Sequence, residues 1–82
     1  MITILDEVAG ERSRQNIKWG LDSIVRRNAE TGLRVLVEEV GEVAKAINER
    51  HGPDCRAELV QVAAVAVAMI EALDAGSGLV AD

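Results

Sequence analysis

The sequence predicts an all-α fold in which helices pack on one another. Apolar residues recur at the helical period through the middle of the chain, and residue types that begin or end helices flank the periodic segments. The available core side chains are also small, because Trp19 is the only aromatic residue and the chain has no Phe or Tyr. A core of Val, Ala, Leu and Ile lets helices approach closely and favours helix-on-helix packing.

Length and composition predict one small domain over residues 1–82. A chain of this size buries only about 60–65% of the surface that its unfolded state exposes, so it is marginally stable alone. The net charge of −5 argues against nucleic acid or an anionic membrane as a partner. Cys55 is the only cysteine, and no apolar run approaches the ~20 residues that a membrane span needs. We therefore expect a soluble cytoplasmic protein.

The first predicted helix covers residues 3–19. Thr3 followed by Asp6 has the pattern of a reciprocal helix cap, and Gly20 is suited to end the helix. Residues 21–32 are less regular, and a loop or a short helix fits them. Asn28 and Thr31 are both suitable caps for the helix that follows.

The second predicted helix runs from Asn28 or Thr31 to Arg50. Its charged side is Glu38, Glu42, Lys45 and Glu49, Glu39 lies at the border, and Gly52 with Pro53 is expected to end it. His51 is expected to complement the dipole at its C-terminal end. The apolar side forms one arc at 100° per residue: Leu33, Leu36, Val37, Val40, Val43, Ala44 and Ile47.

The last predicted helix starts at Asp54, as its cap, and continues to about Ala75, with Gly76 as terminator and 76–82 as a frayed tail. From residue 59 to residue 70 it is apolar on every side except at Gln61. Such a helix has to be buried all round, which three helices cannot achieve. We therefore expect a homodimer or homotetramer with this helix at its centre.

Acidic residues meet across the connection between the last two helices. Glu38, Glu39 and Glu42 precede it, and Glu58 with Gln61 follows it. A charge run is commonly a solvated helix face, but carboxylates at this spacing repel one another, and a Gln inside an apolar helix needs a polar partner. Oxygen ligands without Cys or a suitably placed His favour Mg²⁺, with Mn²⁺ as a second option, over zinc.

The pattern Glu38-Glu39-x-x-Glu42, then Glu58-x-x-Gln61, resembles the EExxE…ExxD signature of the MazG-like all-α nucleoside triphosphate pyrophosphohydrolases. The resemblance covers about residues 6–75, is weak over 20–32, and departs from the family at Gln61, where the pattern has Asp. It implies an antiparallel helical bundle completed by homo-oligomerisation. It also implies Mg²⁺-dependent hydrolysis of a (d)NTP to the (d)NMP and pyrophosphate, as nucleotide-pool house-cleaning.

The resemblance also suggests individual roles. It implies that Glu39, Glu42 and Glu58 hold the metal, with Gln61 a weaker ligand, and Glu38 is the candidate general base because it points farthest from the apolar arc. The cations Arg14 and Lys18 could contact phosphate and Trp19 could stack on the base; a solvated helix face ending in a buried Trp is the alternative. The alternative function is a non-catalytic oligomerisation or nucleotide-sensing module whose metal site is impaired by Gln61.

Overall fold

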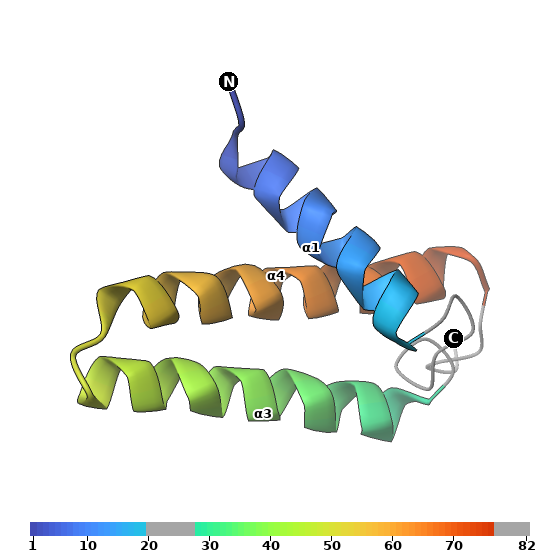
Figure 1. Cartoon of the computed structure of the whole chain (residues 1–82). Coiled ribbons are helices and arrows are strands. Elements are labelled where there is room, and N and C mark those ends of the chain that lie inside the picture. Colours follow the sequence, from blue (N-terminus) through green and yellow to red (C-terminus); the bar gives the residue numbers. More distant parts are fainter. Residues whose placement is uncertain (20–27, 77–82) are drawn as a thin grey trace.

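The computed structural model describes residues 1–19 and 28–76, and within these ranges it contains helices and no strands (Figure 1). The all-α prediction is therefore confirmed for the described part of the chain. The helices are α1 (Ile4–Trp19), α3 (Ala29–Asn48) and α4 (Gly52–Asp74).

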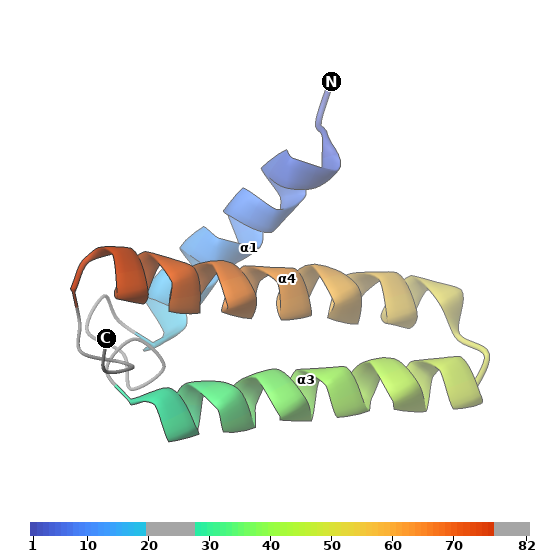
Figure 2. The same ribbon diagram turned by 180° about the vertical axis from the view of Figure 1, so that it is seen from behind.

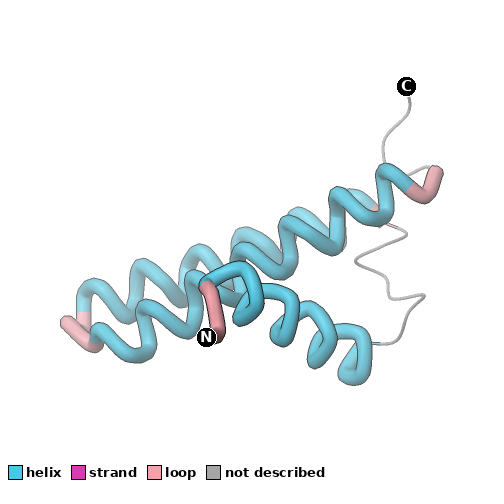
Figure 3. The backbone as a smooth tube through the Cα atoms, turned by 90° about the horizontal axis from the view of Figure 1, so that it is seen from above, coloured by secondary structure: helices cyan, strands magenta, loops and turns pink. Residues whose placement is uncertain are grey.

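Helices α3 and α4 form an antiparallel hairpin and lie side by side along most of their lengths (Figures 1 and 2). Helix α1 crosses the hairpin obliquely and packs chiefly on α4 (Figure 3). Its N-terminal end diverges from the hairpin axis, so hollows remain between α1 and α4. No helix in the described ranges is both long enough and apolar enough to cross a membrane.

Local hydrogen bonds explain where α1 and α3 begin. The Thr3 backbone N–H donates to Asp6 Oδ2 at 2.9 Å, and the Asp6 N–H donates to Thr3 Oγ1 at 3.1 Å, so the predicted reciprocal cap is present. At the start of α3 the Asn28 side-chain oxygen accepts from the Thr31 N–H at 3.1 Å. Asn28 is therefore the cap, and Thr31 lies inside the first turn. Gly20 and most of the predicted loop or short helix fall in residues 20–27, outside the described residues.

The end of α3 differs from the prediction. The helix stops at Asn48, two residues earlier than expected, and Arg50 takes the left-handed conformation with φ 56°. The His51 N–H donates to the Ala46 carbonyl at 2.9 Å, and the Arg50 N–H donates to the Ile47 carbonyl at 3.0 Å. These two bonds form a Schellman motif, which satisfies the last carbonyls before Gly52 and Pro53 are reached.

The start of α4 corrects two further predictions. His51, not Asp54, is the N-cap: its Nδ1 accepts from the Asp54 backbone N–H at 3.2 Å. The His51 side chain therefore caps the helix that follows it, while its backbone N–H bonds to the end of the helix before it. Pro53 lies in the first turn, where its fixed φ favours the helix and its missing N–H costs nothing. At the other end Gly76 has φ 71°, as expected for the terminator; residues 77–82 are outside the described part.

The described core is small. Its buried apolar residues are Ala46, Ala64, Val65, Ala68 and Ala72. Val65 and Ala68 form its centre, where Val35, Leu36 and Met69 pack against them.

Only part of the predicted apolar arc of α3 faces α4: Leu36 packs against the core, and other members of the arc do not. Glu39 lies on the facing side and contacts Glu58, whereas Leu33, Val37, Val40 and Ile47 of the arc remain half exposed or more. Helix α4 is likewise open on one side, so within one copy it is not buried all round. The intramolecular packing therefore leaves much of the apolar surface of the hairpin uncovered.

Candidate functional site

Two carboxyl groups predicted as metal ligands meet between α3 and α4. The pKa of Glu39 is raised to about 7 by partial burial, by the facing carboxyl of Glu58 and by repulsion from Glu42, while Lys18 opposes the shift. A protonated Glu39 can donate a hydrogen bond to Glu58, whereas two ionised carboxylates repel each other. The hairpin thus holds two carboxyl groups from different helices close together, and binding of a proton or a cation between them would relieve their repulsion.

Glu58 has an oxygen that the described protein leaves without a partner. Its Oε2 is buried and accepts no hydrogen bond. Buried polar atoms are rarely left without partners, so this oxygen is a site where a ligand, an ion or a water would be stabilised. Glu42, one turn after Glu39, lines a small hollow of about 90 Å³ together with Glu58, Lys45 and Glu49.

A second hollow, of about 260 Å³, lies between α1 and the hairpin. It brings together four residues that the sequence pattern had singled out, namely Arg14 and Lys18 from α1, Glu39 from α3 and Gln61 from α4. The α1 residues of this hollow recur at positions 11, 14, 15 and 18, a spacing that places them on one face of the helix. Predicted phosphate contacts and two predicted metal ligands therefore share one hollow. The structure describes the backbone of Trp19 but not the position of its side chain.

Gln15 was not predicted as a site residue. It is only 4% exposed, its Oε1 has no hydrogen-bond partner within residues 1–19 and 28–76, and it lines the same hollow as Arg14 and Lys18. The neighbouring Asn16 also has a buried oxygen that no described residue contacts by a hydrogen bond. The sequence could have suggested Gln15, because it lies on the same helix face as Glu11, Arg14 and Lys18. Its burial could not be predicted in this way, because it depends on how α1 crosses α4.

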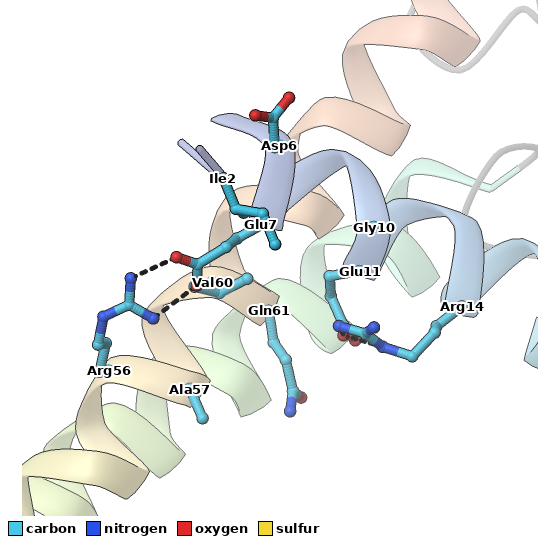
Figure 4. Close-up of a pocket in the computed structure, with 10 residues that line it drawn as sticks. All are labelled: Ile2, Asp6, Glu7, Gly10, Glu11, Arg14, Arg56, Ala57, Val60 and Gln61. Carbon is cyan, nitrogen blue, oxygen red and sulfur yellow. Dashed lines mark hydrogen bonds and ion pairs between the residues drawn. The ribbon is translucent and has the colours of Figure 1, made fainter. Parts of the chain in front are cut away.

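The largest of these hollows, about 420 Å³, lies beside the second one and shares Glu11, Arg14 and Gln61 with it (Figure 4). Both of its arginines face carboxylates. Arg56 binds the two Glu7 oxygens at 2.6 and 2.7 Å, which lowers the pKa of Glu7, and Arg14 Nε donates to Glu11 Oε2 at 2.8 Å. Arg14 is therefore held at the boundary between the two hollows by a neighbour on its own helix.

Some predicted residues are not brought together. Glu38 is exposed on α3, one residue away from the side that carries Glu39. Among the described residues, no three His, Cys, Asp or Glu side chains converge closely enough to hold a metal ion. The hairpin therefore supplies a carboxylate pair, Glu39 and Glu58, with Glu42 nearby, and not a finished three-carboxylate site.

No protein-family model, no curated protein and no solved structure matches this chain.

Proposed function

We propose that this protein is a MazG-like, Mg²⁺-dependent nucleoside triphosphate pyrophosphohydrolase that converts a (d)NTP into the (d)NMP and pyrophosphate. The observation that carries the proposal is the hollow between α1 and the hairpin. There Arg14 and Lys18 line the same hollow as Glu39 and Gln61, and Glu39 contacts Glu58 of α4. Cations that suit phosphate next to carboxylates that suit a divalent metal are the combination this reaction needs.

The donor set fits Mg²⁺ in its chemistry. Glu39 and Glu58 offer hard carboxylate oxygens, and the buried Glu58 Oε2 has no hydrogen-bond partner among the described residues. Completing the site would require Glu42 or the amide oxygen of Gln61 to turn towards this pair. Bound Mg²⁺ would supply positive charge that offsets the charge of the triphosphate and acidifies the attacking water.

The remaining residues would bind substrate and move a proton. Arg14 would exchange part of its contact with Glu11 for a phosphate oxygen, and Lys18 would add a second cation at the same hollow. Glu38 is the proposed general base, because it is exposed and a carboxylate outside the ligand set can accept the proton of the attacking water. Trp19 is the proposed stacking partner of the base.

The proposal predicts Mg²⁺-dependent release of pyrophosphate from at least one member of a panel of ribo- and deoxyribonucleoside triphosphates. Glu58→Gln should lower the rate at least ~100-fold, since removal of a metal-binding carboxylate removes charge stabilisation from the transition state. Pyrophosphate release is measured with a coupled phosphate assay. Glu30→Gln is the matched control: Glu30 is an exposed α3 carboxylate that lines neither hollow, and its variant should keep the wild-type rate.

A thermal melt with and without Mg²⁺ adds a readout that does not depend on finding the right substrate. Mg²⁺ should raise the melting temperature of the wild type and not that of Glu58→Gln. The proposal is wrong if no triphosphate releases pyrophosphate and Mg²⁺ leaves the wild-type melting temperature unchanged.

Two observations favour a second candidate. The described residues contain no group of three ready metal ligands, and Gln61 brings no charge where the resembling family has Asp. These features would suit a helical oligomerisation or nucleotide-sensing module without catalysis. Such a module would bind a triphosphate, as measured by calorimetry, yet release no pyrophosphate from it.

A further inference from the structure

Gln15 of α1 is a buried polar side chain to which the proposed function assigns no role. It is 4% exposed, and its Oε1 accepts no hydrogen bond from residues 1–19 or 28–76. A buried amide oxygen without a donor costs free energy, and native proteins rarely keep one. A ligand that donates a hydrogen bond to this oxygen would recover that free energy on binding.

The hollow between α1 and the hairpin is the place where such a ligand would meet Gln15. Its lining is Glu11, Arg14, Gln15, Lys18, Glu39 and Gln61. Neither of its cations donates to the Gln15 Oε1, and the guanidinium of Arg14 is bonded to Glu11 instead. The hollow therefore contains a buried acceptor that its own donors do not satisfy.

The triphosphate part of a nucleotide does not supply the missing donor. Ionised phosphate oxygens accept hydrogen bonds and donate none, so they suit the cations Arg14 and Lys18 and not an amide oxygen. The nucleoside part does supply donors, namely the N–H groups of the base and the hydroxyl groups of the sugar. One nucleoside triphosphate thus carries a partner for the cations and a partner for Gln15.

The position of Gln15 along α1 also fits a nucleoside. Positions four apart in a helix are neighbours, so Gln15 lies one turn before Trp19, the proposed stacking partner of the base, as Arg14 lies one turn before Lys18. The hollow of about 260 Å³ adjoins one of about 420 Å³, and ligand sites typically occupy roughly 300–1,000 Å³. The two hollows together therefore have room for a nucleoside beside its phosphates.

We propose that Gln15 recognises the nucleoside of the substrate, its Oε1 accepting a hydrogen bond from a base N–H or a sugar hydroxyl. This inference rests on the proposed nucleoside triphosphate site and adds the residue that distinguishes a nucleotide from bare polyphosphate. A site built to hydrogen-bond one group of a ligand discriminates strongly against a ligand that lacks this group, because the buried partner is then left unpaired.

Gln15→Met tests the proposal, because methionine has a similar length and shape but no amide. The ligands are inorganic triphosphate and α,β-methylene analogues of ribo- and deoxyribonucleoside triphosphates, which resist cleavage between the α- and β-phosphates. Calorimetry with Mg²⁺ present measures their affinities. The variant should bind the analogue that the wild type prefers at least ~10-fold more weakly, and inorganic triphosphate as the wild type does.

The 2′,3′-dideoxy counterpart of the preferred analogue distinguishes the two sources of the donor. If the Gln15 Oε1 accepts from a sugar hydroxyl, Gln15→Met should bind this counterpart as well as the wild type does. If it accepts from a base N–H, the ~10-fold loss should persist and should differ between bases.

Asn16→Leu is the matched control. Asn16 also has a buried amide oxygen without a hydrogen-bond partner among the described residues, but it lines neither hollow, so this variant should keep both affinities. A melt of ligand-free Gln15→Met adds a readout of stability. Its melting temperature should equal or exceed that of the wild type, because the substitution removes an acceptor that the fold leaves unpaired.

Equal losses for nucleotide and inorganic triphosphate, no loss for either, or a wild type that binds no nucleotide analogue would overturn the proposal. A lower melting temperature or a failure to fold in Gln15→Met would also overturn it, because the amide would then serve the fold. Pyrophosphate release decides the proposed reaction separately. A protein that binds nucleotides through Gln15 but releases no pyrophosphate keeps this inference and refutes only the enzymatic proposal.

Discussion

At the scale of single residues, Glu39 is the group whose surroundings change its chemistry most. Partial burial and, after it, the facing Glu58 carboxyl favour its protonated form, so its pKa rises from 4.5 to about 7. The folded protein therefore binds more protons than the unfolded chain between these two values. The contribution of Glu39 to the free energy of unfolding is fully present below pH 4.5 and is lost as the pH rises through about 7.

This linkage predicts that Glu39 weakens the protein as the pH rises. From pH 5 to pH 8 the wild type should lose about 1 kcal/mol more unfolding free energy than Glu39→Gln, after allowance for solvent screening of a partly exposed group. Urea unfolding at both pH values and at one fixed protein concentration measures the difference. Parallel pH profiles for the two proteins would show that Glu39 titrates normally.

At the scale of elements, the connection between α3 and α4 depends on the conformation of Arg50. A side chain in the left-handed region costs about 1 kcal/mol relative to Gly, and Arg50 has φ 56°. The two backbone bonds of the Schellman motif hold it there. The hairpin that brings Glu39 to Glu58 therefore contains a position where the native residue is not the most stable one.

Arg50→Gly is expected to stabilise the protein by about 1 kcal/mol, because glycine adopts positive φ without a steric penalty. Chemical denaturation at constant protein concentration measures the change. Glu49→Gly is the control in the same connection: Glu49 has φ −82°, so glycine gains nothing there and should destabilise the protein. Equal effects of the two substitutions would contradict the assigned role of positive φ.

At the scale of the whole molecule, two ion pairs join α1 to α4 in different surroundings. Arg12 is 7% exposed, and its Nε donates to Glu71 Oε1 at 2.8 Å. The Arg56–Glu7 pair, which also spans the two helices, lies at the surface. Both hollows that Arg14 and Gln61 line depend on where α1 lies, so the Arg12–Glu71 pair, in which only the guanidinium is buried, contributes indirectly to the site.

Glu71→Ala is expected to destabilise the protein by about 1–3 kcal/mol, because it leaves the guanidinium of Arg12 buried without its carboxylate. Glu7→Ala should have a smaller effect, since solvent screens the exposed pair. Thermal melts of both variants measure the losses, and faster hydrogen exchange in α1 of Glu71→Ala would locate the loss at the α1–α4 contact. A larger loss for Glu7→Ala would refute this ranking.

Much of the fold follows from interactions within a few residues. The caps at Thr3, Asn28 and Gly76 involve neighbours within four positions, and the helical period depends only on residue spacing. Helix existence and approximate bounds were therefore predictable. The meeting of Glu39 with Glu58 was also predictable, because a short connection between two helices brings residues on either side of it together. The cap of α4 was misassigned to Asp54 because Asp is a preferred N-cap residue and His is not, so the residue types gave no sign that His51 Nδ1 accepts from the Asp54 N–H.

Packing decided the rest, for a physical reason. Helix α3 has two neighbouring lines of side chains that are offset by one residue in the sequence. One line contains Leu36 and Glu39, and the other contains Val37 and Val40. Periodicity alone does not predict which of the two lines contacts α4. The structure places the line with Leu36 and Glu39 against α4, where Ala46 and Ala68 are buried, and leaves Val37 and Val40 at least half exposed. The burial of Gln15 likewise depends on the crossing of α1 over α4. Contacts between distant segments depend on the free energy of the whole packed arrangement, and local sequence patterns carry no information about that free energy.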